Sequence, residues 1–271
     1  MNYQLNKKAL LRSGKSISML DQGIIAGIND AILEAGSVIL HADRSTETVE
    51  EKAGHANFVT SYDKAIQEML RERLLSILPE AVFVGEEEDV HAQIREGYSF
   101  IVDPIDGTTN FIRDMHCSTV SIGLLLDAEP VYAAIYNPYL EELFTAEKGR
   151  GAYLNGRPIR VSDKPLSEGI VVFGTSPYYP ELSKKGFELL IKLFNRALDI
   201  RRFGSAAYDL CLVAAGRAEL FFEMQLSPWD YAAGSLIVNE AGGSVTQIDG
   251  SPLSFGHPCS VLARGGHNET I

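Results

Sequence analysis

Residues 103–110 read Asp-Pro-Ile-Asp-Gly-Thr-Thr-Asn and directly follow the apolar run 98–102, which is typical of a buried strand. Pro104 and Gly107 favour a turn, which would direct Asp106 back toward Asp103. Two carboxylates held close together repel each other unless a cation lies between them, and such oxygen ligands suit Mg²⁺. Free backbone N–H groups where residues 107–109 open a helical turn would bind phosphate oxygens. This one segment therefore offers metal ligands and a phosphate site together.

Each acidic element has an ordinary structural explanation when it is taken alone. Asp-Pro and Asp-Gly are common turn dipeptides, and the run Glu86–Asp89 could be a solvated acidic loop. Asp230, next to Trp229, could simply cap a helix. All three groups nevertheless place carboxylates at the end of an expected helix or strand, where they could converge. Their joint occurrence favours a functional site.

Composition limits the class of protein. The 271 residues include 24 Lys+Arg and 36 Asp+Glu, a formal net charge of −12, and this acidity argues against a protein that coats nucleic acid. The length predicts one or two domains. Three dispersed cysteines without a CxxC pair fit a reducing compartment. Neither a secretory signal nor an apolar run of about 18 residues is evident, so we expect a cytoplasmic protein with no membrane association.

Apolar periodicity predicts two helices, at 21–42 and 61–78, after a polar leader at 1–16. Short β-like runs follow closely, with turn signals between them, and we expect an antiparallel sheet behind the two helices. These runs are at 81–84, 98–102, 119–126, 131–136 and 143–145.

The second half of the chain alternates between strand-like and helical segments. Strands are predicted at 170–173, 200–203, 219–223 and 244–246, and helices at 181–197, 206–215 and 229–241. We therefore expect a layered α/β sandwich, with an α+β N-terminal half at 17–164 and an α/β C-terminal half at 165–271. Their seam is a common place for an active site.

Four motifs together resemble the inositol monophosphatase family, within the Mg²⁺-dependent, lithium-sensitive sugar-phosphatase superfamily. The motifs are Asp-Pro-Ile-Asp-Gly-Thr-Thr-Asn-Phe at 103–111, Trp-Asp-Tyr-Ala-Ala-Gly at 229–234 with Glu-Ala-Gly-Gly at 240–243, Gly-Glu-Glu at 85–87, and Val-Thr-Ser-Tyr-Asp at 59–63. The resemblance spans roughly residues 20–265 and implies the sugar-phosphatase fold.

The resemblance also implies a metal-ligand set. Glu86, Asp103 and the carbonyl of Ile105 would hold one Mg²⁺, and Asp103, Asp106 and Asp230 would hold a second. A third, weaker ion near Glu86 would bring the number to two or three per subunit. Mg²⁺ keeps several waters, which fits few protein ligands for each ion.

Further roles follow from the same resemblance. Asp63 and Thr108 would orient and deprotonate the attacking water, with Glu86 nearby. The backbone amides of Gly107 and Thr108 would hold the phosphate. Glu87 would support the metal site or a third ion.

Substrate contacts are expected from the second half of the chain. The segment 204–207 carries Ser205 and Ala206 and resembles the part of the family that faces the substrate ring. Glu223 matches a carboxylate that faces a ring hydroxyl, although it could be a surface residue at a strand end. Lys52 would balance charge at the site, or would be an ordinary solvated lysine.

These features predict a phosphoric monoester hydrolase that converts inositol monophosphate to inositol and phosphate by direct attack of water. Rival substrates on the same metal site are those of a fructose-1,6-bisphosphatase, a nucleotide 3′-phosphatase or a histidinol-phosphatase. A different class is a regulatory protein that contacts RNA or the transcription machinery. The acidity and the complete ligand set argue against that class. Lithium inhibition and a homodimer are expected from the resemblance alone.

Overall fold

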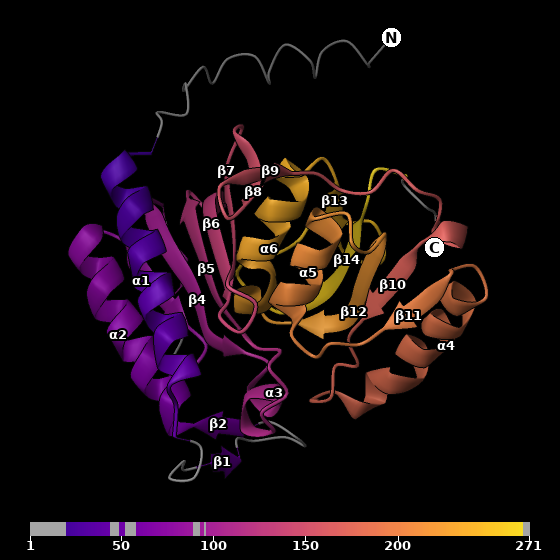
Figure 1. Ribbon diagram of the computed structural model, residues 1–271, viewed down its shortest axis with the longest axis horizontal. Coiled ribbons are helices and arrows are strands. Elements are labelled where there is room, and N and C mark those ends of the chain that lie inside the picture. The colour runs from indigo at the N-terminus through magenta and orange to yellow at the C-terminus, as the bar shows by residue number, and fades with distance from the viewer. Residues whose placement is uncertain (1–19, 44–48, 52–57, 89–92, 95, 268–271) are drawn as a thin grey trace.

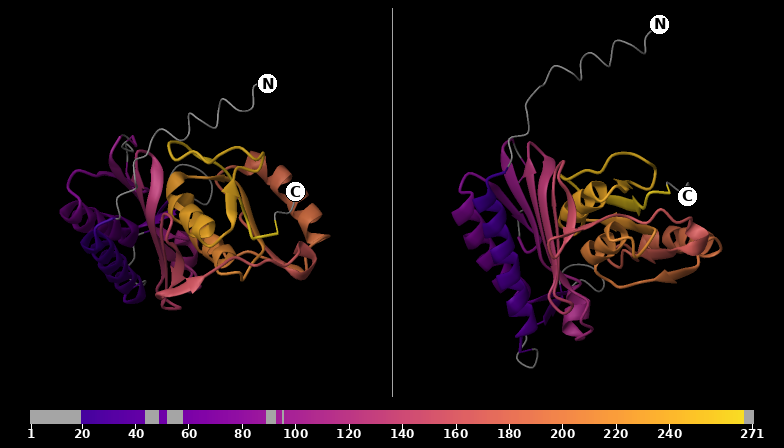
Figure 2. Two further views of the ribbon diagram at one scale, coloured as in Figure 1. Left: turned by 90° about the horizontal axis from the view of Figure 1, so that it is seen from above. Right: turned by 45° about the horizontal axis from the view of Figure 1, so that its top comes forward.

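The computed structural model describes residues 20–43, 49–51, 58–88, 93–94 and 96–267 (Figure 1). Two sheets alternate with three layers of helices. Helices α1 (Gln22–Leu40) and α2 (Ser61–Ile77) cover one face of the first sheet, and α5 (Ala206–Ala214) and α6 (Pro228–Glu240) lie between the two sheets. Helix α4 (Ser183–Phe194) covers the outer face of the second sheet. Figure 2 shows the same layers from two other directions. The predicted layered sandwich is confirmed.

The first sheet has seven strands, in the order β3-β4-β5-β6-β7-β8-β9. They are β3 (Val82–Gly85), β4 (Tyr98–Asp106), β5 (Thr119–Leu126), β6 (Glu129–Asn137), β7 (Glu142–Glu147), β8 (Gly151–Leu154) and β9 (Arg157–Ile159). The sheet is not purely antiparallel as expected, because β3 runs parallel to β4. Strands β8 and β9 were not predicted, and a short two-stranded ladder joins β1 (Val49–Glu51) to β2 (Phe58–Thr60).

The second sheet has five strands, in the order β11-β10-β12-β14-β13. They are β10 (Ile170–Phe173), β11 (Asp199–Arg201), β12 (Leu220–Leu226), β13 (Ser244–Thr246) and β14 (Cys259–Arg264). Strand β10 pairs in parallel with β11 and β12, whereas the unpredicted β14 is antiparallel to β12 and β13. Single turns of 3-10 helix, η1 (Leu166–Glu168) and η2 (Pro180–Leu182), flank β10.

Buried residues on both sides of each layer hold the fold together. One cluster joins α1 and α2 to the first sheet, and another joins α5 and α6 to both sheets. The predicted boundary near residue 164 lies between β9 and β10, and a division into two halves stays a prediction. The predicted leader at 1–16 lies outside the described residues.

Helix α1 is long and apolar enough to cross a membrane by length and composition, the one such helix in the described part of the chain. Its buried residues pack against α2, β5 and β6. They are Ile28, Ala31, Ile32, Ala35, Gly36 and Ile39. The sequence analysis predicted no segment that could span a membrane and did not identify this helix as a candidate. Packing in the core accounts for these six residues, whereas Leu33 and Leu40 of the same helix are exposed.

Gly36 lies where α1 packs tightly against the end of β6. An ideal Cβ there would lie 2.4 Å from ring carbons of Tyr136, whereas a Cβ on Gly27 would meet only the end of the Ile77 side chain, at 2.7 Å. We expect Gly36→Ala to lower the free energy of unfolding by about 1–3 kcal/mol, because the ring has to move. Gly27→Ala should change it by about 1 kcal/mol or less, since helix propensity offsets the contact. Equal effects of the two substitutions in urea unfolding would contradict this packing.

Candidate active site

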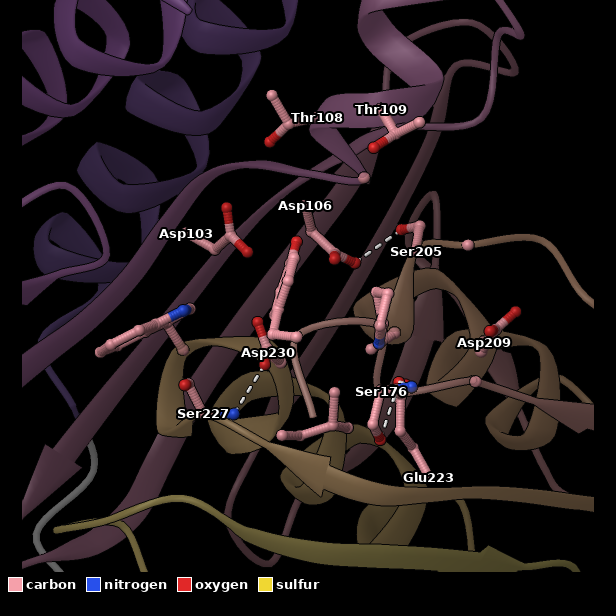
Figure 3. Close-up of a pocket in the computed structure, with 18 of the residues that line it drawn as sticks. Asp103, Asp106, Thr108, Thr109, Ser176, Ser205, Asp209, Glu223, Ser227 and Asp230 are labelled. Carbon is pink, nitrogen blue, oxygen red and sulfur yellow. Dashed lines mark hydrogen bonds between the residues drawn. The ribbon is translucent and has the colours of Figure 1, made fainter. Parts of the chain in front are cut away.

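Three carboxylates, two from the end of β4 and one from the start of α6, converge at one place in the fold (Figure 3). One carboxylate oxygen from each of Asp103, Asp106 and Asp230 lies within 4.8 Å of the others. The predicted strand ends at residue 102, whereas β4 continues to Asp106. Its pairing with β5 shifts between Asp103 and Asp106. Pro104 has no N–H for the ladder, so the predicted turn is instead an irregularity within the strand end.

Hydrogen bonds orient each carboxylate of this cluster. Asp106 Oδ2 accepts from Ser205 Oγ (2.6 Å) and from the Ala207 amide (2.7 Å) at the start of α5. Asp230 Oδ2 accepts from the Ser227 amide (2.7 Å) in a capping box that starts α6. Asp103 Oδ1 accepts from the amide of Ile105, at 3.0 Å. The side-chain directions are thus set by the local backbone of β4, α5 and α6.

Burial makes the charged form of this cluster costly. Burial is the main reason that the pKa values of Asp103 and Asp230 lie well above the usual value. The neighbouring carboxylates raise both pKa values further. The pKa of Asp106 is raised to about 6, also chiefly by burial, although its bond from Ser205 lowers it. A divalent cation would offset this repulsion, and an all-oxygen donor set fits a hard ion. The residues present therefore fit a metal site.

Asp63 lies behind the cluster, at the start of α2. Its carboxylate accepts from the Thr60 amide (2.8 Å) in a capping box, and its Oδ1 accepts from Thr108 Oγ1 (3.1 Å). Thr108 Oγ1 also lies 3.1 Å from the Ile105 carbonyl. Burial and the charge of Glu86 raise the pKa of Asp63 to about 6, against the lowering effect of bonds from Thr60 and Thr108. Thr108 lines the pocket, whereas Asp63 does not.

Of the two glutamates that follow β3, one lines the pocket and the other does not. Glu86 lines the pocket, and its negative charge raises the pKa of Asp103. Glu87 does not line the pocket, and its amide donates to Gln67 Oε1 at 2.8 Å. Lys52 lies outside the described residues.

The expected phosphate site begins α3 (Thr108–Ile112). Gly107 has a φ of 90°, and a Cβ there would lie 3.1 Å from the carbonyl oxygens of Cys117 and Gly204. Only glycine fits this conformation and this spacing without strain. Gly107 and Thr108 both line the pocket beside the carboxylates.

A pocket of about 420 Å³ joins this cluster to residues of the second half of the chain. Ser205, Ala206 and Glu223 line it, as the resemblance implied. Glu223 is buried, and its Oε1 accepts from the Ser176 amide at 2.6 Å. Burial raises the pKa of Glu223 to about 7, despite this bond.

Several further residues of the pocket wall were not predicted from the sequence, among them Tyr178, Arg202 and Asp209. Asp209 is buried in α5, and its Oδ1 has no hydrogen-bond partner among the described residues. Its pKa is raised well above the usual value by burial and by the charges of Asp106 and Glu223. Its position four residues after Ser205, one helical turn along, was the only available signal. Tyr178 belongs to a loop that carries no motif.

Comparisons with known proteins agree with this geometry. A model of the inositol monophosphatase family matches residues 20–270. The Nus factor SuhB of Salmonella typhimurium is 37% identical over 222 residues, 81% of this chain and 83% of that protein. Inositol monophosphatase 2 of Solanum lycopersicum is 38% identical over 235 residues, 83% of this chain and 88% of that protein. A crystal structure of the extragenic suppressor protein suhB from Bartonella henselae matches with a TM-score of 0.84 and 35% identity, covering 90% of this chain and 94% of that one.

The motif resemblance is therefore confirmed along nearly the whole described chain. Members of this family are metal-dependent phosphatases that act on phosphorylated small molecules, and the cluster of Asp103, Asp106 and Asp230 is a candidate for that metal site. The chain belongs to the inositol monophosphatase family and is a phosphoric monoester hydrolase.

Proposed function

We propose that this chain hydrolyses the phosphate monoester of a polyol, inositol monophosphate first among them, with Mg²⁺ as its metal. The observation that carries this proposal is the convergence of Asp103, Asp106 and Asp230 on a pocket whose far wall holds Glu223. A carboxylate at that wall can accept hydrogen bonds from polyol hydroxyls.

The ligands that we propose form two sets that share one residue. Glu86, Asp103 and the Ile105 carbonyl would hold one ion, and Asp103, Asp106 and Asp230 a second. A third ion near Glu86 would be weaker. When bound, Mg²⁺ would lower the pKa of a coordinated water and stabilise negative charge on the leaving oxygen.

Thr108 and Asp63 form a path for the proton of the attacking water. Thr108 Oγ1 lines the pocket and donates to Asp63 Oδ1. A proton that leaves the water passes to Thr108 Oγ1 while the hydroxyl proton of Thr108 moves to Asp63. A carboxyl with a pKa of about 6 can accept that proton and release it near neutral pH.

The remaining roles concern the phosphate and the ring. The Gly107 and Thr108 amides would bind phosphate oxygens at the start of α3, and Ser205, Ala206 and Glu223 would face the ring. Glu87 would support the metal site or a third ion. The pocket lining supports the assignments of Gly107, Thr108, Ser205, Ala206 and Glu223, whereas Glu87 lies outside that lining.

A phosphate-release panel tests the proposal. We expect the highest kcat/KM on inositol 1-phosphate, above fructose 1,6-bisphosphate, a nucleoside 3′-phosphate and histidinol phosphate. EDTA should abolish turnover, Mg²⁺ should restore it, and lithium should inhibit it. Pocket contacts worth about 1–3 kcal/mol separate such substrates. Equal or higher kcat/KM on a rival ester would overturn the inositol assignment, and turnover in EDTA would overturn the mechanism.

A regulatory role in transcription is the second candidate, because a relative that is 37% identical is named a Nus factor. If Asp103→Asn abolished hydrolysis and the cellular phenotype of a deletion were still rescued, the regulatory role would be favoured. A cytoplasmic homodimer without membrane or nucleic-acid contacts also stays a prediction, which size-exclusion chromatography and cell fractionation can check.

A further inference from the structure

The loop 174–179, between β10 and η2, is fastened to the end of β12 by a buried serine. Ser176 has a φ of 44°, a left-handed conformation that is uncommon for residues other than glycine. Its amide donates to Glu223 Oε1 (2.6 Å), and its Oγ lies 3.3 Å from the same oxygen. The Gln225 amide donates to Ser176 Oγ at 3.0 Å. These bonds hold the loop in a single path over the pocket wall.

The same contacts show that Glu223 does more than face the pocket. A Cβ on Gly174 would lie 1.8 Å from Glu223 Oε2, so only glycine lets the loop pass this carboxylate. One carboxylate oxygen thus packs against the loop backbone, and the other accepts two bonds from Ser176. Glu223 therefore shapes the loop, besides any contact with a substrate ring.

Two residues after Ser176, Tyr178 lines the same pocket as the three carboxylates. Its side chain is 45% exposed overall. Its pKa is raised above the usual value by burial first, and then by the charges of Glu86, Asp230, Asp103 and Asp106 in turn. A tyrosine with its ordinary pKa of about 10 is a neutral donor near pH 7, and the hydroxyl of Tyr178 has no hydrogen-bond partner among the residues that the structure describes.

A phosphate group placed among carboxylates needs donors, because carboxylate oxygens only accept hydrogen bonds. Several hydroxyl and amide donors around the pocket are already committed, among them the hydroxyls of Ser205 and Ser176. The hydroxyl of Tyr178 is a donor that remains available at the pocket. On these grounds, and resting on the proposed phosphatase function, we propose that the Tyr178 hydroxyl donates a hydrogen bond to a phosphate oxygen of the substrate. Ser176 and Glu223 act as positioning residues for this contact.

Tyr178→Phe removes only the hydroxyl, so it tests the contact directly. We expect kcat/KM to fall about ten- to a hundredfold, the range for a lost bond to a charged group, and the dissociation constant for inorganic phosphate to rise by a similar factor. Tyr153→Phe on β8 is the matched control, because its hydroxyl donates to the Arg150 carbonyl (2.9 Å) and does not line the pocket. It should change neither value.

Calorimetric titration of inorganic phosphate in Mg²⁺ separates this inference from the proposed function, because it needs no turnover. Equal phosphate affinity in wild type and Tyr178→Phe would overturn the role of Tyr178, whatever the esterase panel shows. Failure of the wild type to hydrolyse any ester would overturn the proposed function instead.

A double-mutant cycle tests the positioning role. Ser176→Ala keeps the backbone bond to Glu223 and removes the hydroxyl that ties the loop to Gln225. We expect it to weaken phosphate binding about threefold in wild type and to have no further effect in Tyr178→Phe, because coupled residues are non-additive. A full Ser176→Ala effect in the Tyr178→Phe background would contradict positioning through the tyrosine.

Discussion

Asp103→Asn is expected to lower kcat by about a thousandfold or more, equivalent to about 4 kcal/mol of barrier. Asp103 is the residue that we propose to share between two ions, and its side chain is buried at the end of β4. An asparagine keeps the size of the side chain and its bond from the Ile105 amide, but it is neutral and offers one oxygen in place of two. The loss would therefore report on metal binding and not on packing.

Two comparisons make this result interpretable. Asp163→Asn changes an exposed carboxylate that pairs with Arg160 and should leave kcat unchanged. Asp230→Asn, on α6 at the opposite side of the cluster, should cost about as much as Asp103→Asn. Single-turnover phosphate release with a thermal melt of each variant measures chemistry and folding separately. A folded Asp103→Asn enzyme within about tenfold of wild type would contradict the shared-ligand role.

The parts of the site with strong local signals could be predicted from the sequence. Thr60 and Asp63 form the capping box that their spacing favours, and the apolar run before Asp103 forms a buried strand. Asp230 lies in the first turn of α6, three residues after the cap residue Ser227. Each of these side chains is placed mainly by its neighbours in the chain, so a local pattern was sufficient.

Other features depend on contacts between distant residues. The bond from Ser176 to Glu223 joins residues 47 positions apart, and no local pattern identifies the loop of Tyr178 as part of the pocket. The parallel pairing of β3 with β4 also depends on distant contacts, because a short apolar run is equally compatible with parallel and antiparallel pairing. Strand β14 lies between β12 and β13 although it follows both in sequence. Tertiary packing decides these features.

The metal-free protein is expected to lose stability as the pH rises from about 4 to 7, whereas Mg²⁺ should offset part of that loss at pH 7. The folded-state pKa values of Asp63 and Asp106 are about 6, against the usual 3.8, so the native state binds more protons than the unfolded state in this window. The free energy of unfolding then falls with pH until these groups have ionised, and below about pH 4 both states are protonated and the effect disappears.

Asp106→Asn tests this window, because it removes one titrating carboxyl and also relieves the repulsion by which Asp106 raises the pKa values of Asp103 and Asp230. Without metal, wild type should lose on the order of 3 kcal/mol relative to Asp106→Asn between pH 4 and 7, the equivalent of about two pKa units. Mg²⁺ at a hundredfold excess over its dissociation constant should restore about 2.7 kcal/mol to wild type at pH 7. Urea unfolding in EDTA and in Mg²⁺ measures both values. A wild-type-minus-variant difference that stays constant with pH would show that Asp106 ionises freely without metal, and the physical argument for a cation at this cluster would then lose its electrostatic basis.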